Sequence, residues 1–201
     1  MKIIGLTGCV GSGKSTVGKK MQEHFSLKLV MTDDVGHLAM EPGTESYENI
    51  INIFGTDIKA LDGKIDRAKL GQIVFGNKEK LEQLNHIIHP WVKEYLRKNI
   101  QEEIEKNQIV YYVMESAILF QSGLNEMCDE IWYVDADEEI RRERLKSSRG
   151  YTDEKIDSIL MNQKENETLK HRCDVIISTN EGENSILPQL EKYLITVHSD
   201  L

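Results

Sequence analysis

Five short runs of apolar residues divide the chain, and longer stretches with polar residues at helical spacing separate them. The runs are KIIGLTG, LKLVMTD, IVYYVMES, EIWYVDA and CDVIISTN. They are nearly continuous rather than alternating, as expected of strands that are covered on both faces. Strands that alternate with helices indicate an α/β architecture. We therefore predict a five-stranded parallel sheet flanked by helices.

Several of the runs end in a polar or acidic residue. These residues are Asp33 and Asp34, Glu115, Asp135 and Asn180. Ligands of open parallel sheets bind at the carboxyl ends of the strands. We expect these positions to line one cleft.

The second and third runs are separated by far more residues than one crossover helix needs. The segment EPGTESYENIINIFG predicts a turn followed by a helix. The segment KEKLEQLNHIIHPWVKEYLRKNIQEEIEKN predicts two helices that meet near His89-Pro90, because proline favours the first turn of a helix. A mostly helical lobe at about 39–107 is the simplest account.

The first run leads into a glycine-rich loop, GCVGSGKS, which a helical pattern follows. This loop matches G-x-x-x-x-G-K-[ST] in the context that its mechanism requires. Its glycines permit backbone angles that turn N–H groups inward, and the next helix adds its positive N-terminal end. The match predicts a P-loop NTPase fold.

The loop predicts an ATP site with its own Mg²⁺. The predicted ATP-binding residues here are Gly11, Ser12, Gly13, Lys14, Ser15 and Thr16. Lys14 would reach the β- and γ-phosphates and act in catalysis, and the Ser15 hydroxyl would join the Mg²⁺ shell. Thr16 would face the helix or an α-phosphate.

Composition narrows the choice of partners. A formal charge of -9 over 201 residues argues against a broad grip on nucleic acid, so any phosphate must be held locally. The three cysteines are far apart and odd in number, which argues against a disulfide framework or a zinc site. No apolar stretch approaches the ~20 residues of a bilayer span. We predict a cytoplasmic protein without nucleic-acid or membrane partners.

Among P-loop proteins, the chain fits a small-molecule kinase better than a GTPase or an ATPase motor. The base-reading N-K-x-D motif of GTPases is missing, since Asn77-Lys78-Glu79-Lys80 ends in lysine. A motor would be larger, with a strand that ends in Asp-Glu. A kinase needs a carboxylate near the acceptor hydroxyl, an acceptor lobe and arginines that close over the phosphoryl group.

The chain has a candidate for each of these parts. Asp33 is the candidate carboxylate, although it could instead cap the next helix. The inserted lobe would hold the acceptor. The arginines are Arg141, Arg144 and Arg149, and Arg144 could instead pair with Glu139 or Glu143 on a solvated helix.

Along essentially its whole length the sequence resembles the dephospho-coenzyme A kinase family. The residues that carry the resemblance are IGLTGCVGSGKSTV, Asp33, EPG at 41–43, FG at 54–55, DGKIDRAKLGQIVF at 62–75, His89-Pro90, AILF from Ala117, Arg144, Gln163 and CDVIISTN. The resemblance implies transfer of the ATP γ-phosphate to the ribose 3′-hydroxyl of dephospho-coenzyme A, the last step of coenzyme A synthesis. It also implies a nucleotide-kinase-like sheet with an acceptor lobe and a short lid.

The resemblance further implies roles for single residues. Asp33 would serve as the base or orient the hydroxyl, Arg144 would contact phosphate, and Asn180 would border the ATP site. Arg67 and His89 would contact the acceptor, whose pyrophosphate suits a fork-shaped donor. We expect a core at 1–38, 108–136 and 170–201, the lobe at about 39–107 and a lid at about 137–169, in a monomer or weak homo-oligomer.

The sequence also departs from the family pattern. Met31 and Gln121 stand where the family has carboxylates, Ala117 replaces a proline, and the second lid arginine is displaced from Ser148 to Arg149. Two alternatives stay open at this point. One is a nucleotide-dependent regulatory switch, and the other is a nucleoside or nucleotide kinase with a different acceptor.

Overall fold

The computed structural model describes residues 1–163 and 168–195, and these form two compact units. The first unit comprises Met1–Val30 and Lys106–Leu201, and the second comprises Met31–Glu105. Parts of the predicted lid (164–167) and of the predicted core (196–201) lie outside the described residues. The division of the first unit into core and lid stays a prediction.

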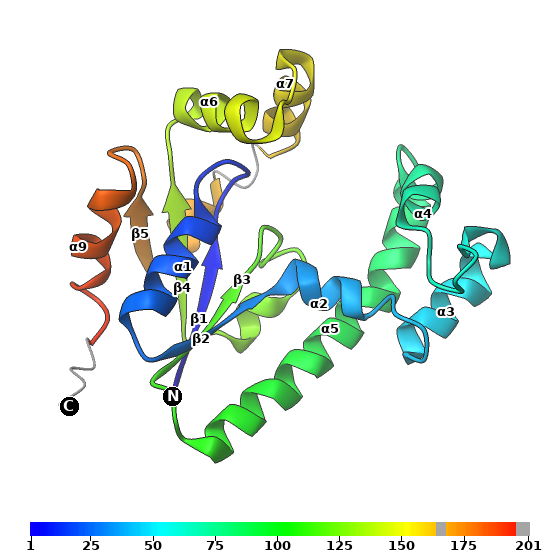
Figure 1. The fold of residues 1–201 in the computed structure, drawn as a ribbon, viewed down its shortest axis with the longest axis horizontal. Helices are drawn as coiled ribbons and strands as arrows, with labels where there is room; N and C mark the ends of the chain where they lie inside the picture. Colours follow the sequence, from blue (N-terminus) through cyan, green and yellow to red (C-terminus); the bar gives the residue numbers. More distant parts are fainter. Residues whose placement is uncertain (164–167, 196–201) are drawn as a thin grey trace. The chain divides into compact units, whose positions relative to one another are not determined.

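The first unit contains a five-stranded sheet with the strand order β2-β3-β1-β4-β5 (Figure 1). The strands are β1 (Lys2–Thr7), β2 (Leu27–Met31), β3 (Tyr111–Glu115), β4 (Glu130–Asp135) and β5 (Val175–Ser178). β1 pairs in parallel with β3 and β4, and β4 pairs in parallel with β5. Each strand lies within one of the five apolar runs, so the predicted fold class is confirmed.

Two helices cover one face of this sheet, α1 (Lys14–His24) and α9 (Ile186–Leu190). Residues two apart on a strand share a face, and Ile4 and Leu6 of β1 both belong to the cluster beneath these helices. The members of this cluster with no measurable exposure are Ile4, Leu6, Val17, Met21, Val113, Trp132, Val134, Ile177 and Leu190. The buried cluster therefore joins β1, β3, β4, β5, α1 and α9 into one body.

The remaining helical segments described in the first unit follow β3, β4 and β5 along the chain. They are η2 (Leu124–Met127), α6 (Glu138–Arg149), α7 (Asp153–Asn162), η3 (Leu169–Arg172) and η4 (Glu183–Ser185). α6 ends where Gly150 adopts a left-handed conformation with φ 61°, which suits a glycine after a helix. Among the described residues, no helix is both long enough and apolar enough to cross a membrane.

The second unit is helical and has its own hydrophobic cluster. It contains α2 (Thr32–Leu38), α3 (Glu45–Phe54), η1 (Thr56–Ile58), α4 (Arg67–Val74) and most of α5 (Lys78–Lys106). The cluster consists of Tyr47, Ile50, Ile51, Ile58, Ile65, Leu70 and Leu84. The turn and helix predicted from EPGTESYENIINIFG are confirmed by α3, which Thr44 caps by accepting a hydrogen bond from the Tyr47 N–H.

The prediction of two helices meeting near His89-Pro90 is wrong, because α5 runs through Pro90 without a break. A proline inside a helix removes one backbone hydrogen bond and costs about 3 kcal/mol or more. Val92, Leu96 and Ile100 are buried beyond the proline at helical spacing. Each such side chain contributes ~1.5–3 kcal/mol on burial, so together they offset the local cost and keep the helix continuous.

Candidate active site

The loop after β1 adopts a conformation that only glycine tolerates at three positions. Gly8, Gly11 and Gly13 have φ angles of 148°, 81° and 91°. A β-carbon at Gly8 would overlap the carbonyl oxygen of Val134, and one at Gly11 would lie 3.1 Å from the Arg141 carbonyl oxygen. The loop is therefore shaped both by its own backbone angles and by the close approach of β4 and α6.

Lys14 begins α1, and its ammonium group lies against the loop. Its Nζ donates hydrogen bonds to the carbonyl oxygens of Gly8 (2.9 Å) and Cys9 (3.0 Å). The Ser12 N–H donates to the Cys9 carbonyl oxygen at 3.2 Å, which closes the loop on itself. Thr16 lies half-buried in the first turn of α1. The cationic group is thus fixed beside the N-terminus of α1, where an anion is favoured.

Ser15 and Glu115 bring two oxygen groups together at the end of β3. The Ser15 hydroxyl donates to Glu115 Oε1 at 3.0 Å, and Glu115 is only 7% exposed. Glu115 pairs with Leu6, near the end of β1. From the sequence, Glu115 was expected only to line a cleft with the other strand-end residues, and it had no chemical role of its own. The signal for a role in the site was its position at the end of the strand predicted from the third apolar run.

Arg144 connects α6 to the loop and to the residue after β5. Its Nη1 donates to the Thr179 hydroxyl and its Nη2 to the Thr179 carbonyl oxygen, both at 2.8 Å. Nη1 also lies 3.4 Å from the carbonyl oxygens of Gly11 and Ser12. The guanidinium is therefore at the predicted ATP-binding loop, and its contact with phosphate stays a prediction.

The other residues of this unit that the sequence singled out have different surroundings. Asn180 accepts a hydrogen bond from the Asp137 N–H through Oδ1 at 2.9 Å, which holds the turn before α6. Gln163 accepts one from the Val10 N–H at 2.8 Å. Arg141 is only 4% exposed, whereas Arg149 is exposed and lies 5.9 Å from the Tyr151 ring centre.

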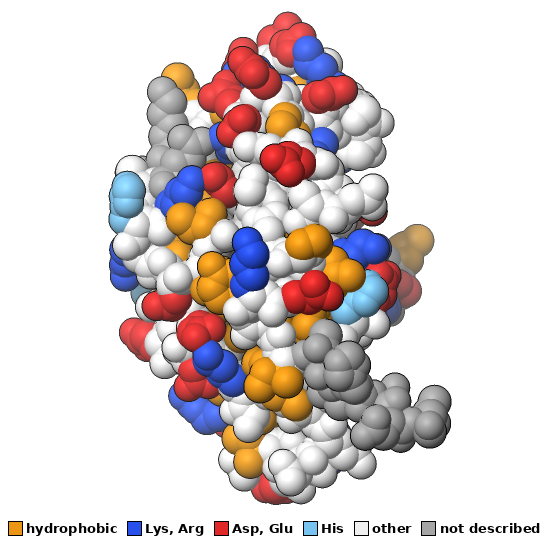
Figure 2. All heavy atoms as spheres, turned by 90° about the vertical axis from the view of Figure 1, so that its left-hand side faces the viewer, with side chains coloured by type: hydrophobic (Ala, Val, Ile, Leu, Met, Phe, Trp, Pro, Cys, Tyr) orange, Lys and Arg blue, Asp and Glu red, His pale blue; other side chains and the backbone are white. Residues whose placement is uncertain are grey.

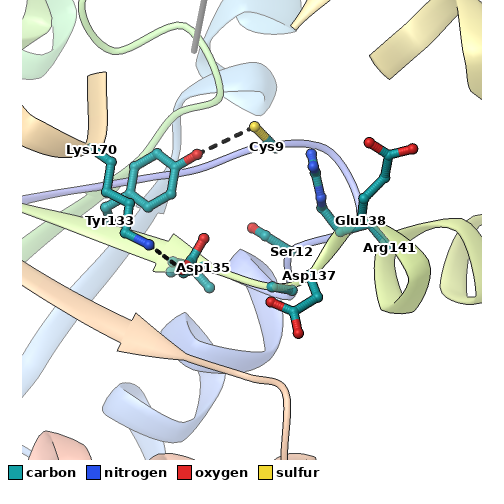
Figure 3. A pocket seen from close by; sticks show the side chains of 10 residues that line it. Cys9, Ser12, Tyr133, Asp135, Asp137, Glu138, Arg141 and Lys170 are labelled. Atoms are coloured by element: carbon teal, nitrogen blue, oxygen red, sulfur yellow. Dashed lines mark hydrogen bonds and ion pairs between the residues drawn. The ribbon is translucent and has the colours of Figure 1, made fainter. Parts of the chain in front are cut away.

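A cavity of about 320 Å³ lies beside the loop, between it and the end of β4 (Figure 3). Cys9 Sγ lies 3.3 Å from the Tyr133 hydroxyl, and Lys170 pairs with Asp135. Burial, and then the neighbouring Cys9, raises the pKa of Tyr133 well above its usual range. The phenol is therefore neutral at physiological pH.

The other two cysteines carry neutral thiols. Burial raises the pKa of Cys128 to about 12 and the pKa of Cys173 to about 11. All three cysteines are free. This agrees with the expectation from the sequence that they are not part of a disulfide framework.

The three predicted acceptor residues all lie in the second unit. Asp33 is exposed in the first turn of α2, and Arg67 is exposed as the first residue of α4, directly after the capping residue Asp66. His89 is half-buried in α5, and burial, together with the charge of His86, lowers its pKa. Their assembly with the loop into one site stays a prediction.

The sequence of this chain matches the model of a known protein family. The model described as dephospho-CoA kinase matches residues 2–185, a range that includes the loop, the whole second unit, Arg144 and Thr179. The chain belongs to the dephospho-CoA kinase family.

Related sequences agree with this family over nearly their full length. The chain is 38% identical to the dephospho-CoA kinase of Carboxydothermus hydrogenoformans, over 94% of this chain and 91% of that protein. It is 35% identical to the dephospho-CoA kinase of Fusobacterium nucleatum, over 97% and 98% of the two chains. As a member of this family, the protein is a kinase.

Solved structures share the fold. A Thermus thermophilus protein superposes with a TM-score of 0.79 at 26% identity, over 95% of this chain and 94% of that one. The dephospho-CoA kinase of Campylobacter jejuni gives a TM-score of 0.63 at 19% identity, over 96% and 97% of the two chains. A shikimate kinase from Acinetobacter baumannii gives 0.53 at 15% identity, over 96% and 91%. The P-loop kinase fold is thus shared beyond the dephospho-CoA kinase family.

We expect Gly8→Ala to destabilise the loop and abolish nucleotide binding, because the added methyl group would overlap the Val134 carbonyl oxygen at an already strained φ. The free energy of unfolding should fall by at least ~1–3 kcal/mol in a urea titration. Gly71→Ala is the matched control, since Gly71 lies inside α4 with nothing within 4 Å of an added β-carbon. Gly71→Ala should be neutral or stabilising by up to ~1 kcal/mol. Equal behaviour of the two variants would contradict the steric account of the loop.

Proposed function

We propose that this protein transfers the γ-phosphoryl group of ATP to the ribose 3′-hydroxyl of dephospho-coenzyme A, giving coenzyme A and ADP. The observation that carries the proposal is the match of one dephospho-CoA kinase model across residues 2–185. The match includes the phosphate-binding loop and the separate helical unit. A regulatory switch would need the first of these parts but has no evident use for the second.

The donor half of the site is formed by the loop and the start of α1. Phosphoryl transfer depends mainly on positioning and on stabilising the charge of the transferring group. Lys14 supplies a positive charge beside the loop. The backbone N–H groups at Gly11, Gly13 and the N-terminus of α1 would donate hydrogen bonds to phosphate oxygens. Arg144, which contacts the Gly11 and Ser12 carbonyl oxygens from α6, belongs to the proposed ATP site. Asn180, which follows β5 and accepts the Asp137 N–H, completes it.

Ser15 and Glu115 fit a site for Mg²⁺. A hydroxyl oxygen and a carboxylate oxygen 3.0 Å apart are the type of donors that Mg²⁺ prefers, with its other positions left to phosphates and water. Among the described residues there is no cluster of three or more His, Cys, Asp or Glu that could hold a metal ion. When bound there, the ion would neutralise charge on the phosphates.

The acceptor half of the proposed site is the second unit. Asp33 would accept or orient the proton of the ribose hydroxyl, and the exposed Arg67 would pair with the pyrophosphate of the acceptor. The lowered pKa of His89 keeps its ring neutral near pH 7, so it would contact the acceptor as a neutral hydrogen-bonding group.

The remaining partner predictions rest on composition. On the face in Figure 2, basic and acidic side chains are interspersed, and the coloured residues there form no continuous basic surface. That nucleic acid is not a partner stays a prediction of the sequence. A cytoplasmic location and a monomeric or weakly associating state stay predictions of the sequence.

The proposed reaction is tested by coupling ADP release to NADH oxidation with purified protein, Mg²⁺ and ATP. We expect ADP release that depends on dephospho-coenzyme A, and a product with the mass of coenzyme A. Uridine, adenosine and nucleoside monophosphates serve as alternative acceptors. ADP release without any acceptor, or a preference for one of the alternatives, would overturn the proposal.

We expect Asp33→Asn to reduce kcat by ~10²–10⁴-fold, because the amide cannot accept the hydroxyl proton. The Kd of ATP, measured by isothermal titration calorimetry, should stay within about twofold of wild type, since Asp33 has no proposed role in the donor half. Asp34→Asn is the matched control, as it removes the neighbouring exposed carboxylate. Near-normal turnover of Asp33→Asn would remove Asp33 from this role.

We expect Glu115→Gln to weaken Mg²⁺-dependent ADP binding by ~10–100-fold, the usual loss when a supporting metal contact is changed. Glutamine retains an oxygen that can accept the Ser15 hydrogen bond but lacks the charge. Calorimetry with Mg²⁺ and with EDTA separates the two contributions, and ADP binding in EDTA should be unchanged. Glu191→Gln, at an exposed position, serves as control. An equal loss in EDTA would show that Glu115 supports the loop alone.

A further inference from the structure

Thr179, the residue after β5, connects three separate parts of the first unit. It is only 2% exposed, and its N–H donates to the Asp135 carbonyl oxygen at 2.9 Å. Its hydroxyl donates to the Ser12 carbonyl oxygen at 2.7 Å and accepts from Arg144 Nη1 at 2.8 Å. Its own carbonyl oxygen accepts from Arg144 Nη2 at 2.8 Å. One buried residue therefore ties the end of β4, the loop and α6 together.

The Ser12 carbonyl oxygen belongs to the peptide whose N–H is that of Gly13. In a trans peptide the C=O and N–H bonds point in opposite directions. A carbonyl held by Thr179 therefore directs the Gly13 N–H away from Thr179. Because the Ser12 N–H is already donated to the Cys9 carbonyl oxygen, the Gly13 N–H is the next backbone donor of the loop.

Thr179 also limits the space around this peptide. A β-carbon on Gly13 would lie 3.4 Å from Thr179 Cγ2 and 3.5 Å from Arg144 Nη1. The methyl group of Thr179 and the guanidinium of Arg144 therefore lie beside Gly13, the capping residue before α1. The Ser12–Gly13 peptide is held by the hydrogen bond from Thr179 to the Ser12 carbonyl oxygen.

The hydroxyl of Thr179 links the charge of Arg144 to the loop. A hydrogen bond from a charged donor is shorter and stronger than a neutral one, and it polarises the hydroxyl that accepts it. The polarised hydroxyl is a better donor to the Ser12 carbonyl oxygen. A hydroxyl is needed at this position because it must accept one hydrogen bond and donate another at the same time.

We propose that Thr179 is a positioning residue for the ATP phosphates, whose hydroxyl orients the Ser12–Gly13 peptide so that the Gly13 N–H donates to phosphate. Thr179 itself contacts no substrate in this proposal. The inference deepens the proposed function and rests on its donor half, ATP binding by the loop. It does not depend on the identity of the acceptor.

The test compares three variants by calorimetry with ADP and Mg²⁺, in the absence of acceptor. Thr179→Val removes the hydroxyl contacts with Arg144, Ser12 and Asp135 at nearly constant volume, and Thr179→Ser keeps the hydroxyl. Ser178→Ala removes the neighbouring hydroxyl, which accepts from the Asn180 N–H at 3.4 Å. We expect the Kd of ADP to rise ~10–100-fold for Thr179→Val and to stay within about threefold for the other two, since one lost contact is charge-assisted.

Two further readouts separate positioning from a purely structural role. The KM of the acceptor at saturating ATP should change by less than about threefold in Thr179→Val. In a double-mutant cycle, Arg144→Lys and Thr179→Val should be strongly non-additive in the Kd of ADP, because both act on the same peptide. If Thr179→Val does not fold, as judged by circular dichroism, Thr179→Ala takes its place with the same expectation.

A lower melting temperature of Thr179→Val with an unchanged Kd of ADP would overturn the proposal, and so would additive effects in the cycle. These outcomes differ from a failure of the proposed function. A wild-type protein that binds ADP but does not phosphorylate dephospho-coenzyme A would overturn the acceptor assignment alone. A wild-type protein that phosphorylates dephospho-coenzyme A, combined with a Thr179→Val variant that binds ADP normally, would overturn only the role of Thr179.

Discussion

The close approach of the loop after β1 to the end of β4 is the constraint on which the candidate site depends. Gly8 passes so near to the Val134 carbonyl oxygen that no side chain fits, and a β-carbon at Gly11 would make a tight contact with the backbone of Arg141. A loop pressed against its neighbours has little freedom to rearrange. Its backbone groups are therefore held in place before any ligand arrives, which lowers the ordering cost of binding phosphate.

The parallel sheet explains why residues far apart in the sequence meet at this loop. Parallel strands all end at the same edge, so residues that follow β1, β3, β4 and β5 become neighbours. Glu115 meets Ser15 there, and Thr179 meets Ser12 and Arg144. One half of this set supplies oxygen donors suited to a metal ion, and the other half holds the backbone that would face the phosphates.

Much of this arrangement was predictable, and the parts that were not have a common cause. Continuous apolar runs identified all five strands, because a strand buried on both faces needs apolar residues at every position. The interruption of the helix expected at Pro90 was wrong, because the burial of Val92, Leu96 and Ile100 outweighs a local helix-breaking signal.

Thr179 was not recognised from the sequence, although Asn180 beside it was, since a hydroxyl at a strand end carries no distinctive spacing. Its importance lies in contacts with Ser12 and Arg144, which are distant in the chain.

The α/β class, the phosphate-binding loop with Lys14 and Ser15, and the resemblance to the dephospho-CoA kinase family can all be recognised from the amino-acid sequence alone. These features depend on residue type at fixed local spacing, which periodicity and motifs record directly. The folded chain was needed to show that Glu115 accepts the Ser15 hydrogen bond, that Arg144 contacts the loop and Thr179, and that α5 continues through Pro90. Such features arise from the packing of distant segments, whose energies exceed local preferences and leave no local pattern in the sequence.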